Sequence, residues 1–337
     1  MPYTMPAGYR RLGRTALNVG RLAVGTVNFG WLTNEEDSFT ILDFALDRGL
    51  NLIDTSNNYN AGITESLLGR WFASGSKREQ VVLATKCYSP PTEFGSRDPM
   101  RASGNWVGPN QRGLSAKHII EACNASLKRL NTDYIDLYQM HHIDRAAPFE
   151  EVWQAFETLI AQGKVIYVGS SNFAGWQIAK ACERARARNF LGPVSEQSTY
   201  SLLNRTVELE VIPACRDYGL GFIPYSPLGG GLLGAAAGAE DGKRSKGMLG
   251  SASEARRRQL ADYAALCKEL GHHPADVAIA WVAANPDVTA PIIGPRTLQQ
   301  LDSALRGLEI TLGADVLARL DALFPGPGGE APEAYAW

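Results

Sequence analysis

The chain has 337 residues, of which 45% are hydrophobic and 20% are charged, so it can bury a large core and is not expected to be disordered. Its formal net charge of -2 gives no electrostatic reason to expect binding to nucleic acid or to an anionic membrane. No apolar run approaches the ~20 residues of a membrane span, and the first residues lack the apolar segment of a signal peptide. The five cysteines are widely spaced and odd in number, as is typical of free thiols. We therefore expect a cytoplasmic protein.

The stretch "YRRLGRTALNV" near the start predicts a β-hairpin with a glycine turn. After it, short runs rich in aliphatic and β-branched residues alternate with stretches of helical periodicity. The eight predicted strands are Arg21–Gly25, Leu50–Asp54, Val81–Lys86, Tyr134–His141, Val165–Ser170, Val194–Gln197, Gly221–Tyr225 and Thr289–Ile293.

Helix signals fill the gaps between these strands. Thr33-Asn34-Glu35-Glu36 matches a capping box, and the helix that it opens is predicted to end at Gly49. Ser115 is a predicted N-cap, and further helices are predicted over Glu150–Gln162 and Pro274–Asn285. Alternating strands and helices imply parallel strands with right-handed crossovers. Eight such units within ~270 residues favour a closed (β/α)8 TIM barrel, with the N-terminal hairpin and an extra C-terminal helix added to it.

No low-complexity linker or change of composition divides the sequence. We expect one domain over residues 1–337, with the barrel core at about 20–310 and a mobile tail at 324–337. The segments Cys87–Gly113 and Ala235–Gly250 are longer than ordinary loops, and loops of such length in compact domains are usually lids or disordered.

Polar side chains stand where three consecutive predicted strands end. Asp54, Lys86 and His141 end the second, third and fourth strands, and Tyr59 follows Asp54 by five positions. The active site of a barrel of this kind lies at the carboxyl ends of its strands. Each residue alone has a structural explanation, as a helix cap, a rim tyrosine or an ordinary buried histidine. Their convergence from three strands favours a catalytic site.

These residue types suit the reduction of a carbonyl group. A phenol has a pKa of about 10, which makes it a weak proton donor at neutral pH. A nearby ammonium lowers that pKa, and a carboxylate keeps the ammonium charged and in place. We therefore predict that Asp54 orients Lys86 and that Tyr59 delivers the proton. A neutral His141 can donate a hydrogen bond to the substrate oxygen.

Two weaker signals are not interpreted as sites. Gly229–Gly234 formally matches G-x-G-x-x-G, but it lies late in the chain after Pro227 and no βαβ unit follows it. The pairs His141-His142 and His272-His273 are adjacent in sequence and lack the spacing that places metal ligands on one face. We expect no metal.

From Tyr9 to about Phe324 the chain resembles the aldo-keto reductases. The resemblance is carried by "NLIDTSNNY", "ATK", "TDYIDLYQMHHID", "GKVIYVGSSNF", "YSPLGGGLL" and "IIGPRTLQQLDSAL". It implies a barrel enzyme that reduces small-molecule carbonyl compounds with a nicotinamide cofactor, usually NADPH. The catalytic Asp-Tyr-Lys-His set of that family falls on Asp54, Tyr59, Lys86 and His141.

The resemblance also implies the residues that bind the cofactor. Ser171 and Asn172 would hold the carboxamide with Gln197 beside them, Tyr225 would stack on the nicotinamide ring, and Arg296 would bind the 2′-phosphate. The remaining implied contacts are Thr26, Val27, Asp54, Ser226, Pro227, Leu228, Gly229, Gly231, Gly294 and Gln300. Two positions depart from the pattern. Ser303-Ala304 replaces a Glu-Asn pair that many relatives use for adenine, and Asn60 replaces a glycine that often follows the tyrosine.

Stretches such as "GTVNF" and "GKVIYVGSSNFAGW" resemble more narrowly the NDP-hexose 2,3-enoyl reductases and dTDP-4-keto-6-deoxyhexose 2,3-reductases of antibiotic deoxysugar biosynthesis. That resemblance implies an NDP-keto-deoxyhexose as substrate. Family members that reduce C=C bonds tend to carry glutamate in place of the histidine, so His141 favours reduction of a ketone, such as the 3-keto group. A late-stage ketoreductase acting on the keto side chain of a glycosylated polyketide would share the same motifs.

An alternative of another class stays open. Potassium-channel β subunits share this fold and the catalytic set, bind NADPH and act chiefly as docking modules. The sequence also leaves open whether the chain forms a homo-oligomer. Trp31 and Trp106 are candidates for lining the substrate pocket.

Overall fold

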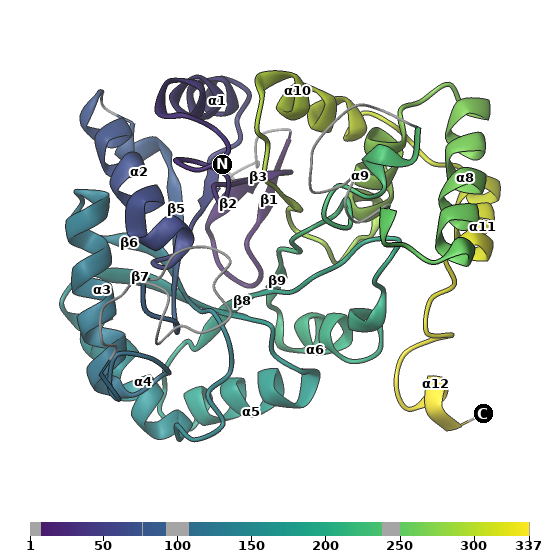
Figure 1. Cartoon of the computed structure of the whole chain (residues 1–337). Coiled ribbons are helices and arrows are strands. Elements are labelled where there is room, and N and C mark those ends of the chain that lie inside the picture. Colours follow the sequence, from purple (N-terminus) through teal and green to yellow (C-terminus); the bar gives the residue numbers. More distant parts are fainter. Residues whose placement is uncertain (1–7, 76, 92–107, 238–249, 337) are drawn as a thin grey trace, which may run out of the picture.

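The computed structural model describes residues 8–75, 77–91, 108–236 and 250–335 with their side chains, and the backbone of residues 237 and 336. Within this part of the chain, eight strands form one parallel sheet in the order β10-β3-β4-β5-β6-β7-β8-β9 (Figure 1). The strands are β3 (Ala23–Gly25), β4 (Leu52–Asp54), β5 (Val82–Cys87), β6 (Ile135–Met140), β7 (Val165–Ser171), β8 (Pro193–Gln197), β9 (Gly221–Phe222) and β10 (Ile292–Ile293). All eight lie where the sequence predicts them.

The two ends of the sheet meet and close the barrel. Single parallel bridges join Phe222 to Val288 and Tyr225 to Ile292. The Ile292 amide donates a hydrogen bond to the carbonyl oxygen of Pro224 at 2.7 Å. Strands β9 and β10 are shorter than predicted, since Pro224 and Pro291 have no amide hydrogen for the ladder. The predicted (β/α)8 architecture is confirmed.

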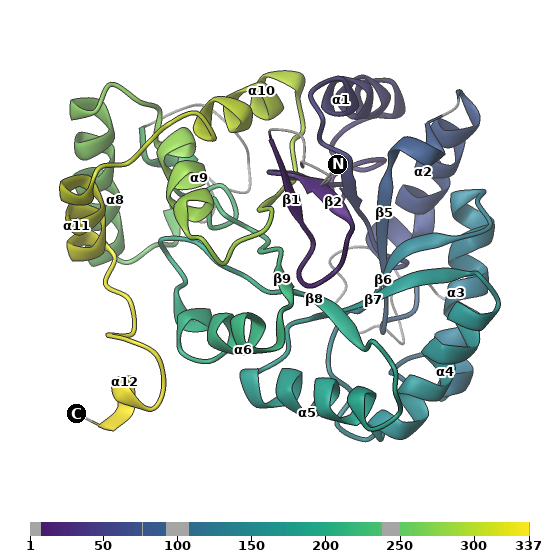
Figure 2. The ribbon, with the colours of Figure 1, turned by 180° about the vertical axis from the view of Figure 1, so that it is seen from behind.

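A ring of helices surrounds the strands (Figures 1 and 2). The ring contains α1 (Glu35–Asp47), α2 (Ile63–Ala73), α3 (Ala116–Leu130), α4 (Phe149–Ala161), α5 (Gly175–Arg186), α6 (Val211–Tyr218), α9 (Pro274–Ala284) and α10 (Leu298–Gly307). Among the described residues, the helices α8 (Glu254–Glu269), α11 (Ala314–Leu323) and α12 (Glu333–Ala336) lie outside the ring. The α8 ring of Tyr263 packs edge-on against Phe324, which follows α11, so the extra C-terminal helix is anchored to α8.

The helix caps agree with the sequence in one case and differ in another. Ser115 accepts a hydrogen bond from the His118 amide and caps α3 as predicted. At α1 the cap is Asn34, whose Oδ1 accepts from the Asp37 amide at 2.8 Å. Thr33, the predicted cap, instead donates to the backbone oxygen of Arg296 at 3.3 Å. Asn34 therefore caps α1, and Thr33, one residue before it, links the start of α1 to the loop after β10.

The predicted hairpin is formed by β1 (Tyr9–Arg11) and β2 (Asn18–Gly20). It covers the amino ends of the barrel strands, where the Gly20 amide donates to Asn51 Oδ1 at 2.9 Å. Its turn residue Gly13 has a φ of 56°, and a Cβ there would lie 2.5 Å from the amide nitrogen of Gly221. Only glycine fits this close approach of two backbones. The opposite, carboxyl end of the barrel is left uncovered by the hairpin.

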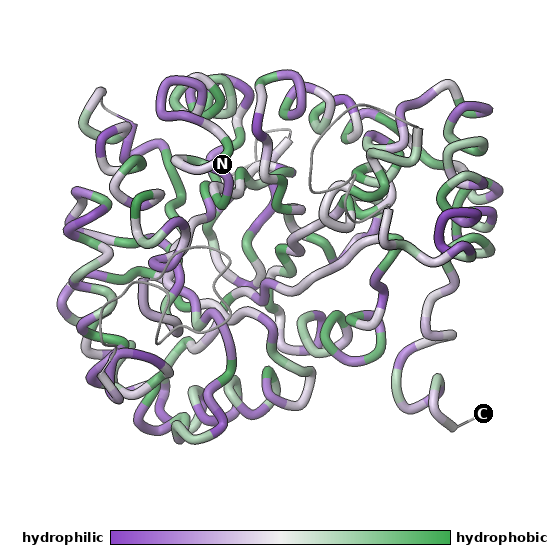
Figure 3. The backbone as a smooth tube through the Cα atoms, in the orientation of Figure 1, coloured by the Kyte–Doolittle hydropathy of each residue, from purple (hydrophilic) through white to green (hydrophobic). Residues whose placement is uncertain are grey.

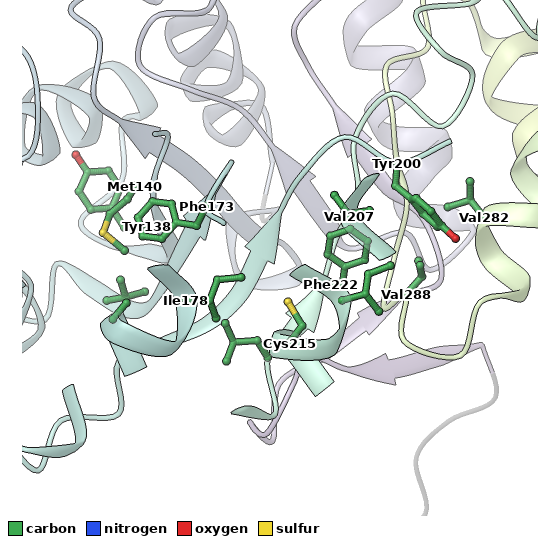
Figure 4. Packing of buried hydrophobic residues seen from close by; sticks show 14 of the residues in the cluster. Tyr138, Met140, Phe173, Ile178, Tyr200, Val207, Cys215, Phe222, Val282 and Val288 are labelled. Atoms are coloured by element: carbon green, nitrogen blue, oxygen red, sulfur yellow. The ribbon is translucent and has the colours of Figure 1, made fainter. Parts of the chain in front are cut away.

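Two apolar layers hold the barrel together. Inside it lie buried side chains from the hairpin and from the strands, including Leu12, Leu52 and Leu137. Outside it, the strands pack against the helices in a larger cluster, part of which includes Tyr138, Phe173 and Ile178 (Figure 4). Hydrophobic and hydrophilic segments alternate along the helices (Figure 3), as expected of helices with one buried face.

The C-terminal tail makes defined contacts with the barrel. The Ala331 amide donates to the carbonyl oxygen of Leu209 at 3.0 Å, and Arg216 pairs with Glu330 at 2.9 Å. Mobility of the tail and the single-domain organisation stay predictions.

Candidate active site

The carboxyl ends of β4 and β5 bring three of the predicted catalytic residues together. The Lys86 ammonium is fully buried and donates hydrogen bonds to Asp54 Oδ2 at 2.7 Å and to the Tyr59 hydroxyl at 3.3 Å. Its third hydrogen bond goes to the backbone oxygen of Thr55 at 2.8 Å. All three donors of the ammonium are therefore used, and Tyr59 lies at the end of a chain that starts at a buried carboxylate.

Tyr59 is held by an unusual backbone segment. It opens the short 3-10 turn η1 (Tyr59–Gly62), in which Asn60, Ala61 and Gly62 have φ values of 48°, 56° and 87°. Glycine adopts this left-handed region freely and asparagine tolerates it, which accounts for Asn60 at this position. The Asn60 side chain also donates to the backbone oxygen of Gly30 at 2.6 Å. The turn is thereby fixed to the loop after β3.

Asp54 is anchored from the opposite side of the barrel as well. Its Oδ1 accepts hydrogen bonds from Gln197 Nε2 at 2.8 Å and from Gln139 Nε2 at 3.2 Å. Sequence reasoning assigned Gln197 to the cofactor and missed Gln139. The signal was available, since Gln139 is a polar residue within an apolar strand and shares the inward face of β6 with Leu137. Both carboxylate oxygens of Asp54 are thus occupied by side chains from three other strands.

Burial is the largest single influence on the pKa values of Tyr59 and Lys86, and the neighbouring charges come second. Burial raises the pKa of Tyr59, and the neighbouring Lys86 charge opposes this without reversing it. Lys86 lowers the phenol pKa as predicted, but desolvation outweighs the ammonium, so the net shift of the Tyr59 pKa is upward. For Lys86, burial lowers the pKa, but the charges of Asp54 and Tyr59 outweigh it and the pKa is raised. At neutral pH, Tyr59 carries its proton and Lys86 its charge.

His141 lies beside Tyr59, with ring centroids 6.2 Å apart and the rings edge to face. Its Nδ1 is 3.1 Å from Ser56 Oγ, and its ring stacks on His142 with centroids 5.0 Å apart. Burial and then the Lys86 charge place the pKa of His141 well below its ordinary value, so the ring is neutral as predicted. The fourth predicted residue thus completes a cluster at one end of the barrel.

The residues predicted to hold a nicotinamide carboxamide lie on the adjacent strands β7 and β8. Asn172 has a φ of 61°, and its Nδ2 donates to the backbone oxygen of His141 at 3.1 Å and to Ser171 Oγ at 3.0 Å. Its Oδ1 accepts from the Tyr225 hydroxyl at 2.9 Å. Within the described residues, the Ser171 hydroxyl donates no hydrogen bond and Gln197 Oε1 accepts none. One donor and one acceptor therefore remain, which is the complement of an amide.

A carboxylate behind the barrel wall supports this pair of strands. Glu196, on β8, is fully buried and accepts hydrogen bonds from Ser198 Oγ at 2.7 Å, from the Phe173 amide at 3.1 Å and from Ser170 Oγ. Burial raises its pKa to about 7. Sequence reasoning missed Glu196, although a glutamate directly before the predicted Gln197 in an apolar strand was a visible signal. It fixes the turn that carries Asn172.

The remaining predicted cofactor contacts divide into two groups. Ser226 and the glycines at 229, 230 and 231 have φ values of 57°, 57°, 72° and 95°, so the turn after β9 has left-handed residues that suit an anion-binding backbone. Arg296 is half-buried, and no acidic partner for its guanidinium occurs among the described residues. The buried Pro227 and the half-buried Leu228 belong to the turn after β9, and the exposed Gly294 lies two residues before Arg296. The half-buried Val27 lies apart from both segments in sequence, just after β3.

Two other predicted contacts already have partners within the protein. Thr26 is fully buried, and its hydroxyl donates to the backbone oxygen of Asp54 at 2.9 Å. Gln300 Oε1 accepts from the Arg296 amide at 2.9 Å. Of the two tryptophans proposed for the substrate pocket, Trp31 is 47% exposed, and Trp106 lies outside the described residues. The roles of all these residues stay predictions.

Neither a metal-binding cluster nor a membrane-spanning helix is found in the residues that the structure describes. No group of three or more His, Cys, Asp or Glu side chains is placed to hold a metal ion there. In the same part of the chain, no helix is both long and apolar enough to cross a membrane.

Comparison with known proteins identifies relatives over nearly the whole length. The model of the aldo/keto reductase family matches residues 21–324. Uncharacterized oxidoreductase YrpG of Bacillus subtilis is 52% identical over 335 residues, which cover 98% of this chain and 99% of YrpG. Versiconal hemiacetal acetate reductase of Aspergillus parasiticus is 31% identical over 93% of this chain and 96% of its own length. A probable voltage-gated potassium channel subunit beta of rice, Oryza sativa subsp. japonica, is 32% identical over 94% of this chain and 96% of its own.

Proposed function

The chain belongs to the aldo/keto reductase family, and from that premise we propose that it reduces a ketone with NADPH, using Tyr59 as the proton donor. As a member it is an NAD(P)-dependent oxidoreductase that acts on small-molecule carbonyl compounds. The observation that carries the proposal is the buried chain from Asp54 through Lys86 to the Tyr59 hydroxyl. We place the reaction in the cytoplasm.

In this proposal the chain's own residues handle the proton. The bound cofactor supplies a hydride to the carbonyl carbon. Tyr59 transfers its proton to the carbonyl oxygen as negative charge develops there. Lys86 stabilises the phenolate that is left, and Asp54 keeps Lys86 charged by offsetting the cost of its burial. His141, whose ring lies beside Tyr59, would hydrogen-bond to the same oxygen through Nε2.

The residues that would hold the cofactor fit its chemistry. The Ser171 hydroxyl and Gln197 Oε1 offer a donor and an acceptor to the carboxamide, and the half-buried Tyr225 ring lies beside them through its bond to Asn172. The Arg296 guanidinium has no acidic partner among the described residues and can bind a phosphate, which favours NADPH over NADH. Ser303-Ala304 replaces the Glu-Asn pair that many relatives use for adenine. The proposed preference for NADPH therefore depends on Arg296.

For the substrate we propose a ketone on a natural-product intermediate, most specifically the 3-keto group of an NDP-keto-deoxyhexose. The narrower motif resemblance and the retained His141 support a ketone over a C=C bond. The second candidate within the enzyme class is the keto side chain of a glycosylated polyketide. Norsolorinic acid reductase B of Dothistroma septosporum, 31% identical over 95% of this chain, is by its name a reductase of another natural product.

A docking role is the candidate of a different class. It is favoured by the similarity to probable potassium channel β subunits of rice and Arabidopsis thaliana, each 32% identical. A docking protein would bind NADPH and hardly consume it, whereas a reductase turns it over.

The test is NADPH consumption by the purified protein, followed by absorbance. A dTDP-3,4-diketo-deoxyhexose generated in place is compared with simple aromatic aldehydes. Turnover of the sugar nucleotide alone supports the deoxysugar ketoreductase. Turnover of aldehydes alone rejects that substrate and keeps the reductase. Tight NADPH binding without turnover of any carbonyl compound favours the docking role.

A further inference from the structure

Ser56 lies in the loop between β4 and Tyr59 and is fully buried. Its Oγ is 3.1 Å from His141 Nδ1, 2.8 Å from Asn58 Oδ1 and 3.4 Å from Asn57 Oδ1. A serine hydroxyl has one hydrogen to donate. Two amide oxygens, which can only accept, and one ring nitrogen, whose role depends on the tautomer, therefore surround a single donor next to the proposed active site.

The direction of that hydrogen decides what His141 offers to a ligand. A neutral imidazole carries one hydrogen, on either Nδ1 or Nε2. If Ser56 donates to Nδ1, the ring hydrogen must be on Nε2. If Ser56 donates elsewhere, its oxygen faces Nδ1 as an acceptor and the ring hydrogen belongs on Nδ1. Nε2 has no hydrogen-bond partner among the described residues, so it is the nitrogen left for a ligand.

The distances favour donation to Asn58. The contact of 2.8 Å between Ser56 Oγ and Asn58 Oδ1 is the common length of an O–H···O hydrogen bond. The contact of 3.1 Å to His141 Nδ1 falls within the range of an N–H···O bond. We propose that Ser56 is a positioning residue that donates to Asn58 and accepts from His141 Nδ1, so that the neutral ring presents a bare Nε2 in the free protein.

For catalysis this inference rests on the proposed reduction of a carbonyl group. A carbonyl oxygen and a bare Nε2 are both acceptors and cannot hydrogen-bond to each other. The productive ring carries its hydrogen on Nε2, which is reached when Nδ1 releases a proton to water and Nε2 takes one from water. The Ser56 hydroxyl must then turn from Asn58 to Nδ1. Asn58 therefore disfavours the productive form.

The direct test reads the ring hydrogen and does not depend on turnover. Protein labelled with 15N-histidine is examined by NMR through the couplings of the two ring nitrogens, with the His141 signals assigned from His141→Gln. We expect hydrogen on Nδ1 in the wild-type protein and a shift of the population toward Nε2 in Asn58→Ala. The Asn58 side chain caps no helix, so its removal leaves the turn intact. A ring protonated on Nε2 in the wild-type protein would overturn the proposal.

Two variants separate the effect of Ser56 from other effects of Asn58. Asn57→Ala removes the neighbouring amide, which lies farther from Ser56 Oγ at 3.4 Å, and should leave the ring hydrogen where it is. In a Ser56→Ala background, Asn58→Ala should no longer move the hydrogen. A shift of equal size in that background would mean that Asn58 acts without Ser56, and would also overturn the proposal.

Turnover gives the second readout. With a carbonyl substrate, Asn58→Ala should raise kcat/KM by about fivefold, the weight of one neutral hydrogen bond, and this gain should vanish when Ser56 is alanine. A gain that persists without Ser56 counts against the proposal. If no variant reduces any carbonyl compound, the proposed function fails, while the NMR result still decides the position of the hydrogen.

Discussion

Gln197 donates a hydrogen bond of 2.8 Å to Asp54 across the interior of the barrel, from β8 to β4. The residue predicted to bind the cofactor thus also holds the carboxylate that holds Lys86. The predicted cofactor site and the proposed proton-transfer site therefore share one hydrogen-bond network.

Gln197→Leu is expected to lower the free energy of unfolding by about 1–3 kcal/mol, because it leaves a buried carboxylate oxygen short of a donor. Urea unfolding measures the loss. The matched change Gln139→Leu should cost less, since its contact with Asp54 is longer, at 3.2 Å. A larger loss of unfolding free energy for Gln139→Leu would mean that the longer hydrogen bond stabilises the Asp54 carboxylate more than the shorter one does.

Tyr59→Phe removes the proton donor and keeps the ring. General acid catalysis contributes about 10²–10⁴-fold, so kcat should fall by at least about 100-fold. The affinity for NADPH, measured by fluorescence titration, should be unchanged, because the lost hydroxyl bonds only to Lys86 among the described residues. Near-normal turnover of Tyr59→Phe would show that Tyr59 is not the proton donor.

Arg296→Ala should weaken NADPH binding more than NADH binding, because a guanidinium binds a phosphate that NADH lacks. Titration of the variant with both cofactors measures the difference. Arg306→Ala is the matched control, since Arg306 lies on α10 and pairs with Asp302. Equal weakening of the two cofactors would show that Arg296 does not contact the 2′-phosphate.

Glu196→Gln should change how stability depends on pH. Burial raises the pKa of Glu196 from 4.5 to about 7, so between these values the folded protein keeps a proton that the unfolded chain has released. The free energy of unfolding should therefore fall as pH rises through this window, by on the order of 3 kcal/mol in total. Above the folded pKa the contribution stays lost.

The glutamine variant cannot titrate and should lack this fall. Urea unfolding of both proteins at about pH 5 and about pH 8 tests the expectation, with the exposed Glu309→Gln as control. The same decrease in Glu196→Gln as in the wild-type protein would contradict the assignment.

The strands and the clustering of Asp54, Tyr59, Lys86 and His141 were predictable because their signals are local. Apolar runs ending in Asp54, Lys86 and His141 place these residues at one end of a barrel once the strands are known to be parallel. The net direction of the Tyr59 pKa shift was not predictable in the same way. Burial of Tyr59 depends on how several loops pack, and it outweighs the Lys86 charge that the sequence makes visible.

Partners of side chains across the barrel were also beyond the sequence. Gln197 donates to Asp54, 143 positions away, and the register of the two strands decides that contact. The exchange of Thr33 for Asn34 as the α1 cap shows the same limit on a smaller scale. A capping box specifies a helix start, and tertiary contacts decide which of two adjacent side chains closes it.

Single bridges join the β9 and β10 ends of the described sheet, whereas its other neighbouring strands form ladders. Proposed cofactor contacts stand on both sides of this closure, Tyr225 and Ser226 on one and Gly294 and Arg296 on the other. A dinucleotide that touches both sides would act as a clasp across this seam and oppose its local opening. Amide hydrogens at the seam, such as that of Ile292, should then exchange with solvent more slowly when the cofactor is bound. The bound cofactor would then reinforce a closure that the two bridges already make.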